Sequence, residues 1–169
     1  MSEEDVTEER DDGAPIEVLE AYFEARGWAC ERSGEGEIIA SAPGSWAQYE
    51  LRGVWRPEDQ VLQFLAFPDV KVAADKRQAI YETLGLVNEQ LWLGHFELWS
   101  SSGLIVFRYA ALVEAGEDDG LSFEQAESIT EAALEECERF YPVFQFVLWG
   151  GKSPTEAIQA ALIETAGEA

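Results

Sequence analysis

The stretch His95-Phe-Glu-Leu-Trp-Ser-Ser-Ser-Gly-Leu-Ile-Val-Phe-Arg108 decides the fold, because it describes two short strands joined by a turn of small residues. If the residues at the two ends of the turn pair, Phe96 faces Phe107 and one side of the hairpin is apolar throughout. The other side is mixed and carries His95, Glu97, Trp99, Leu104, Val106 and Arg108. This hairpin predicts an antiparallel sheet with one face in a core and a second face of a different kind.

A second hairpin is predicted around Pro57, between strands at 46–55 and 60–67. Pairing Trp55 with Gln60 again places mostly apolar side chains on one side. The other side is mixed and carries Gln48, Glu50, Arg52, Val54, Val61, Gln63, Leu65 and Phe67. Because both hairpins have a mixed side with aliphatic residues and an arginine, we expect a surface suited to a dimer mate, a bound peptide or a packed helix.

Turn residues and hydrophobic periodicity predict the remaining elements. Two further strands are expected near 28–32 and 37–42, and the strands of the first hairpin span 95–99 and 104–113. The complete order is α-β-β-β-β-α-β-β-α-α. Short connections between neighbouring strands favour an α+β domain whose antiparallel sheet has about five to six strands with flanking helices.

The four helices of this order are predicted from apolar stripes and from residues that favour helix ends. They are expected at 15–26, at 73–91, from Ser122 to about Val147, and at 154–165. The long third helix should be kinked or restarted at Pro142, because proline lacks the amide hydrogen that a helix needs. Capping boxes are expected at Asp75 with Gln78, Ser122 with Gln125, and Ser153 with Glu156.

The charge of the chain limits its partners. Its 169 residues include 11 Lys plus Arg and 34 Asp plus Glu, for a formal net charge of −23. Nucleic acids and anionic membrane surfaces attract proteins through Lys and Arg, so neither is an expected partner. An apolar share of 47% and an aromatic share of 12% nevertheless supply a core, and most Trp and Phe residues are predicted to pack in it.

The ends of the chain differ from its middle. Residues 1–14 are rich in acids and poor in apolar residues, so we predict a disordered acidic tail, followed by a single domain over 15–166. The N-terminus lacks the basic and apolar pattern of a signal peptide, and no apolar run reaches the ~18 residues of a membrane span. A cytoplasmic location is therefore expected.

No motif in the chain names a reaction. His95 is the only histidine, and Cys30 and Cys137 lack the spacing of a thiol-based metal site, so we predict no metal ion and no cofactor. Gly150-Gly-Lys-Ser153 ends like a phosphate-binding loop but lacks its first glycine, so we expect a turn between two helices. Without a visible nucleophile or acid–base pair, we predict no catalytic residue and no enzyme activity.

Four segments together resemble the bacterial YbjN family of sensory transduction regulators. They are Leu93-Gly-His-Phe-Glu-Leu-Trp99, Gly103-Leu-Ile-Val-Phe-Arg-Tyr109, Arg139-Phe-Tyr-Pro-Val-Phe-Gln145 and Lys152-Ser-Pro-Thr-Glu-Ala-Ile158. The resemblance covers about residues 15–163 in element order. It implies a fold like that of type III secretion chaperones, which are small acidic α+β proteins, often dimeric, that hold segments of a partner. It implies no catalytic residues.

These observations favour a non-enzymatic chaperone-like or regulatory binding protein, a homodimer that engages a protein or peptide client. The expected partner-binding residues lie on the mixed sides of the two hairpins: Arg52, Gln63, Leu65, Glu97, Trp99, Val106 and Arg108. An alternative is a small-molecule-sensing regulator of bacterial signalling or stress response, with its ligand between the sheet and the helix at 73–91. A third hypothesis is an enzyme that uses carboxylates alone.

Overall fold

The computed structural model describes residues 14–114 and 120–167. Except for Ala14, the predicted acidic tail lies outside these residues. The elements are α2 (Ala14–Ala25), β1 (Cys30–Gly34), β2 (Glu37–Pro43), β3 (Gln48–Arg56), β4 (Val61–Phe67), the short 3-10 helix η1 (Ala74–Lys76), α3 (Arg77–Asn88), β5 (His95–Trp99), β6 (Leu104–Leu112), α4 (Phe123–Leu148) and α5 (Pro154–Gly167). The predicted α+β class and element order are confirmed.

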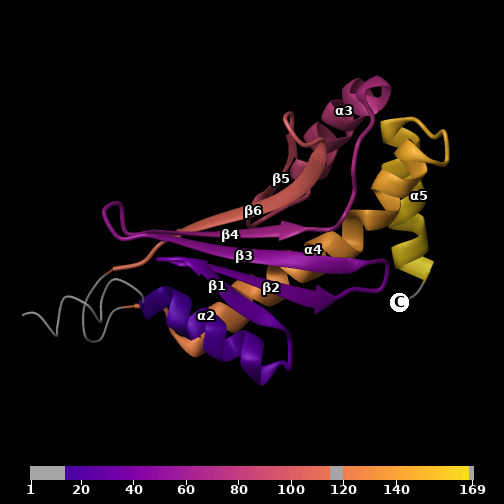
Figure 1. The fold of residues 1–169 in the computed structure, drawn as a ribbon. Coiled ribbons are helices and arrows are strands. Elements are labelled where there is room, and N and C mark those ends of the chain that lie inside the picture. Colours follow the sequence, from indigo (N-terminus) through magenta and orange to yellow (C-terminus); the bar gives the residue numbers. More distant parts are fainter. Residues whose placement is uncertain (1–13, 115–119, 168–169) are drawn as a thin grey trace, which may run out of the picture.

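The strands form one antiparallel sheet in the order β1-β2-β3-β4-β6-β5. Helix α4 crosses the sheet at β4 and β6, α2 packs beside it on β2 and β3, and α5 packs on α3 and α4 (Figure 1). The main apolar core lies between this helical layer and the sheet, and includes Phe64, Phe96, Phe107 and Phe144. The helices therefore cover one face of the sheet.

The predicted pairing of the hairpin β5–β6 is confirmed. His95 faces Arg108, Phe96 faces Phe107 and Glu97 faces Val106. The turn between the strands ends in Gly103, whose φ of 74° lies in the left-handed region that a glycine adopts without strain. The structure therefore has the apolar side and the mixed side that this pairing predicts.

The predicted pairing of the hairpin β3–β4 is wrong by two residues. Trp55 faces Leu62 rather than Gln60, and Arg52 faces Leu65. The turn has four residues, as expected, but it lies one residue later, at 57–60, and its last residue Gln60 takes a left-handed φ of 53°, a conformation uncommon for a residue other than glycine. Since a shift of two residues keeps every side chain on its own face, the predicted division into two sides survives this error.

The helix ends agree with the sequence in part. Ser122 and Gln125 form the expected capping box, with bonds of 3.1 and 2.8 Å, and the Glu156 amide donates to the Ser153 hydroxyl at 3.2 Å. The capping box at Asp75 is wrong, because this residue lies inside η1 and no side chain caps that helix or α3. Pro142 lies within α4, which continues to Leu148 and is not restarted there.

No helix among the described residues combines the length and the apolar character that crossing a membrane would require.

Candidate functional site

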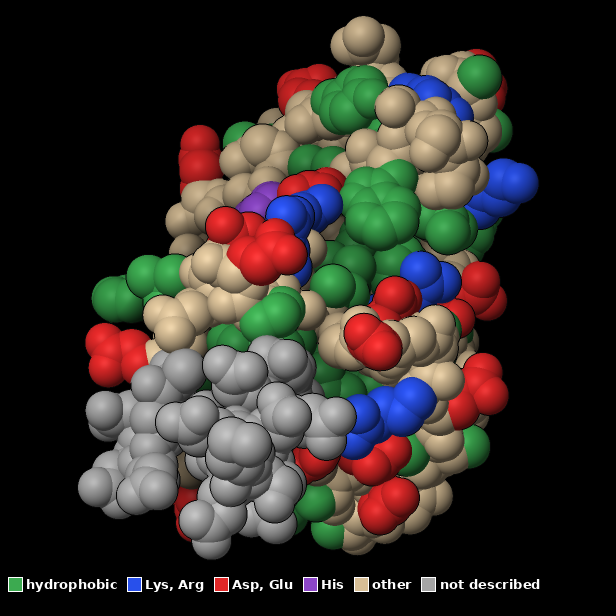
Figure 2. Space-filling model, turned by 60° about the vertical axis from the view of Figure 1, so that its left-hand side comes forward, with side chains coloured by type: hydrophobic (Ala, Val, Ile, Leu, Met, Phe, Trp, Pro, Cys, Tyr) green, Lys and Arg blue, Asp and Glu red, His purple; other side chains and the backbone are tan. Residues whose placement is uncertain are grey.

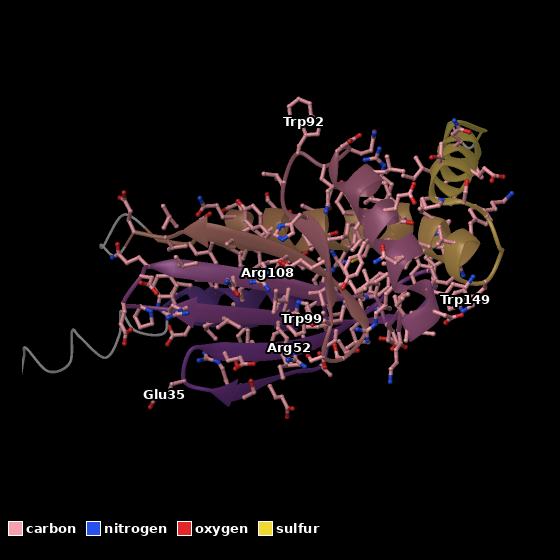
Figure 3. The ribbon with its side chains drawn as sticks, turned by 90° about the horizontal axis from the view of Figure 1, so that it is seen from above. Glu35, Arg52, Trp92, Trp99, Arg108 and Trp149 are labelled. Carbon is pink, nitrogen blue, oxygen red and sulfur yellow. The ribbon has the colours of Figure 1, made fainter. Side chains whose placement is uncertain are left out.

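All seven residues predicted to bind a partner lie on the sheet face opposite α4, here called the open face. The pairing of the strands sets Arg52, Leu65, Arg108 and His95 in one row across β3, β4, β6 and β5. Figure 3 shows Arg52, Trp99 and Arg108 on the side of the sheet that faces the viewer, with α4 behind it. Gln63 is in the next row, between Val54 and Ala110.

Glu97 is the centre of a polar network on this face. Its carboxylate accepts bonds from Arg108 at 3.0 Å and from the Trp99 indole at 3.1 Å, and His95 Nε2 lies 2.7 Å from Oε1. Arg108 Nε adds an ion-pair contact of 2.9 Å to Oε1. Partial burial alone would raise the pKa of Glu97, but the bonds from His95 and Trp99 and the charge of Arg108 outweigh it and hold this pKa below its ordinary value. The network thus fixes Trp99 and Arg108 through an ionised carboxylate.

At the centre of the open face the apolar residues are covered by side chains of this same chain, whereas Leu112 at the end of β6 is 81% exposed. Val106 is completely buried, and Leu65 and Phe67 are nearly so, in a small cluster with the half-buried Trp99 and Leu104. Phe67 meets Trp99 edge to face at a centroid distance of 5.3 Å. A partner on this face would therefore touch the outer surfaces of Trp99 and Leu104 rather than Leu65 or Val106.

Arg52 covers the other side of this cluster. Its guanidinium lies 4.9 Å from the centre of the Phe67 ring and bonds to Glu50 at 2.9 Å. A groove of about 480 Å³ runs beside it, lined by Gln48, Glu50, Arg52, Phe67, Asp69, Trp99, Ser102 and Leu104. In Figure 2, hydrophobic side chains lie between groups of basic and acidic side chains on the face that carries the histidine. The open face is thus an aromatic strip between two arginine–glutamate pairs.

Large exposed hydrophobic side chains are the features that sequence reasoning missed. Of the six tryptophans only Trp28 and Trp55 are buried, while Trp92 is 99% exposed and projects from the loop before β5 (Figure 3). The expectation that most tryptophans lie in the core is therefore wrong, although it holds for phenylalanine. The sequence did carry a signal, since Trp92 lies outside every periodic pattern, two residues before the turn glycine Gly94.

Other sequence features have structural roles. Cys137 is buried, and burial raises the pKa of its thiol; burial is also the largest cause that raises the pKa of Cys30. Gly150-Gly-Lys-Ser153 links α4 to α5, as expected for a turn between helices. Among the described residues no group of three or more His, Cys, Asp or Glu side chains is arranged to hold a metal ion.

The alternative hypothesis places a ligand between the sheet and the helix at 73–91, but this helix packs closely against the sheet. Helix α3 buries Ile80, Leu84 and Val87, and its last residue, Asn88, bonds to the backbone of Phe96 in β5 at 2.8 and 3.1 Å. A groove of about 1020 Å³ lies elsewhere, between β6 and the first half of α4.

Comparisons with known proteins agree with this fold. A model of the YbjN family, described as "putative bacterial sensory transduction regulator", matches residues 15–146. The crystal structure of YbjN, "a putative transcription regulator from E. coli", is similar over 79% of this chain and 88% of that one, with 12% identity and a TM-score of 0.51. At this identity the likeness bears on the fold alone.

The crystal structure of the ExsC–ExsE complex aligns with 76% of this chain and 92% of that one, with 16% identity and a TM-score of 0.48. No curated protein matches the chain. The description of the matching family is that of a regulator and names no reaction.

Proposed function

The chain belongs to the YbjN family, and from this premise we propose that it is a non-enzymatic binding protein with a regulatory or chaperone-like role. Its open face engages a protein partner, and a second copy of the chain is one such partner, which makes the protein a homodimer. The observation that carries the proposal is the network in which Glu97 holds Trp99 and Arg108 on a sheet face that α4 does not cover.

Tryptophan and arginine are the residues that most often dominate binding energy at protein interfaces. Their usual disadvantage is the conformational entropy that they lose on binding. On the open face this loss is reduced in advance, because the Trp99 indole and the Arg108 guanidinium already share one carboxylate. The aromatic strip is therefore ordered before a partner arrives.

The charges of the open face also suit a second copy of the chain. Although the whole chain carries −23, the centre of this face balances Arg52 with Glu50 and Arg108 with Glu97. In a two-fold dimer the same patch meets itself, so a locally neutral patch is where two acidic chains approach with least repulsion. The remaining repulsion is long-range, and salt should therefore strengthen the dimer by screening it.

The experiment is a mutant cycle on self-association, followed by sedimentation velocity. Arg108→Ala leaves the Glu97 carboxylate without its cation and should weaken the dimer about tenfold or more, since an interfacial charge that loses its partner is strongly destabilising. The double variant Arg108→Ala with Glu97→Ala should recover part of that loss. The matched control is Arg32→Ala, which breaks an exposed pair with Glu20 outside the open face and should change the dissociation constant little.

Equal effects of Arg108→Ala and Arg32→Ala on the dissociation constant would contradict the proposal. The same holds if the double variant associates no better than Arg108→Ala alone, because the loss would then not come from a stranded carboxylate.

A further inference from the structure

The last strand of the sheet is unevenly paired. Strand β6 runs from Leu104 to Leu112, but β5 pairs only with its residues 104–108. Residues 109–112 have β4 on one side and, among the described residues, no strand on the other. Figure 1 shows β6 continuing past the end of β5. Half of this strand therefore forms a sheet edge.

The alternation of an antiparallel ladder shows where the backbone groups of this edge point. Asn88 bonds both backbone groups of Phe96, so these face away from β6, and the Val113 amide bonds to Gln60 on the β4 side at 2.9 Å. Even-numbered residues of β6 then turn their N–H and C=O groups away from β4. Beyond the end of β5, those residues are Ala110 and Leu112, and no side chain or turn of the described chain bonds to their backbone.

The edge of β5 is occupied in part, in contrast to that of β6. The Asn88 side chain forms hydrogen bonds with the N–H and C=O groups of Phe96, and the Arg77 guanidinium donates to the Ser100 carbonyl at 2.9 Å. Helix α3 thus protects both ends of the β5 edge, in the way that proteins commonly cover exposed strands. Within the part of the chain that the structure describes, the neighbouring edge at Ala110 and Leu112 has no such protection.

The groove of about 1020 Å³ runs along this unprotected edge. One wall is formed by α4, and the lining combines the polar Ser122, Gln125 and Ser128 with apolar residues that include Leu93, Tyr109, Ala111, Leu121, Ile129 and Ala132. Leu93 and Leu112 are 54% and 81% exposed. Among the described residues of the lining, Glu114 is the one that carries a charge. The described part of the edge therefore combines free backbone groups, a groove with apolar residues, and negative charge.

We propose that the outer edge of β6 at Ala110 and Leu112 binds an extended segment of a partner protein as an added strand, with apolar side chains at alternate positions and Lys or Arg between them. The added backbone pairs with the free groups of the edge, every second side chain enters the groove, and the basic residues meet the acidic chain. The inference rests on the proposed function, since it names a class of partner, but it uses a different surface.

Charge selects this occupant over a second copy of the chain. Each copy carries −23, and the described residues that line this edge include no basic side chain to offset the approach of another copy. An extended basic segment gains from the same field that repels a copy.

The test measures binding of a fluorescent peptide of alternating lysine and valine to the native chain. A second peptide with serine in place of valine has the same charge and cannot fill the groove. The native chain should bind the valine peptide saturably and at least about tenfold more tightly than the serine peptide, because several buried methyl groups are lost. On binding, amide hydrogen exchange should slow at Ala110 and Leu112.

Two variants of one residue separate backbone pairing from side-chain contact. Ala110→Pro removes only an N–H that points outward, so the ladder with β4 stays intact, and it should weaken binding about tenfold. Ala110→Val keeps this N–H and should bind like the native chain. Should the proline variant fail to fold, the exchange rates of the native chain decide the question alone.

Equal binding of the two peptides would overturn the proposal, because charge alone would then explain binding. Equal peptide binding by the proline and valine variants, or the absence of saturable binding, would also overturn it. So would amide exchange at Ala110 and Leu112 that slows as the protein concentration rises without peptide, because a second copy would then cover the edge. Peptide binding and self-association are measured separately on the native chain, so failure of this site and failure of the open face are distinguishable.

Discussion

The two faces of the hairpin β5–β6 are made of alternate residues of the same strands, yet they are held by different forces. On the covered face Phe96 is 2% exposed and packs against the rings of Phe107, Phe140 and Phe144. On the open face its neighbour Glu97 organises Trp99 and Arg108 through polar bonds. Apolar contacts stabilise the fold at any pH, whereas a charged network responds to pH and salt. The covered side of this hairpin thus stabilises the fold, and the opposite side carries the charged network on which the proposed binding site rests.

The largest expected loss of stability comes from a substitution on the covered face. Phe96→Ala removes three ring contacts and leaves a cavity, so the free energy of unfolding in urea should fall by about 3–5 kcal/mol. The matched variant Trp99→Ala truncates a half-buried ring on the open face and should lower it by less than ~2 kcal/mol. Equal losses of unfolding free energy in the two variants would contradict the stated difference between the two faces.

A smaller effect is expected where the faces meet at the β5 edge. Asn88→Ala leaves the N–H and C=O groups of Phe96 without their partner, and should lower the free energy of unfolding by about 1–3 kcal/mol. Asn88→Asp keeps an acceptor for the N–H and should lose less. Amide exchange at Phe96 should accelerate in the alanine variant; an unchanged exchange rate would show that the side chain does not protect this edge.

The next effect depends on pH and is confined to the open face. Because the pKa of Glu97 is lowered in the folded chain, its ionised form stabilises the fold above the ordinary value of 4.5, and this contribution is lost as the pH falls through the lower folded pKa. Glu97→Gln should therefore lower stability on the order of 1 kcal/mol at neutral pH and less in acid. Urea unfolding across a pH series measures this difference. Gln63→Ala, an uncharged change on the same face, should show no such pH dependence, and a constant effect of Glu97→Gln would contradict the account.

The smallest effect is expected at the N-terminus. From composition alone we propose that residues 1–14 are a tail separate from the domain at 15–166, because seven acids and one base within 1–12 leave little apolar surface to bury. Deleting residues 1–12 should leave the melting temperature almost unchanged. A loss of more than about 5 °C would show that this segment packs on the domain.

Side-chain alternation is the part of the fold that sequence predicts well. The pairing of β5 with β6 follows from two short apolar patterns and a glycine turn, and it already places Arg108 diagonal to Glu97. The pairing of β3 with β4 could not be obtained in this way, because nothing in the identity of Gln60 signals its left-handed conformation. The face division survived only because the error was an even number of residues.

The sequence predicts which residues share the open face, but it does not predict how far each of them is buried. Strand alternation placed Leu65 and Val106 on the open face, but their burial depends on how Phe67, Trp99 and Leu104 pack around them. Likewise, an aromatic residue indicates a core only where a periodic pattern supports it, and Trp92 has none. Side-chain arrangements that involve several strands are not encoded in any one local pattern.

The most direct test of the central claim is the mass of the native chain in solution, measured by sedimentation equilibrium over a range of protein and salt concentrations. If the open face takes a second copy, the mass should rise from 18.8 kDa toward twice that value as the protein concentration increases, and added salt should favour the dimer by screening the charge of −23. A mass that stays at 18.8 kDa at high protein and high salt concentration would contradict the homodimer.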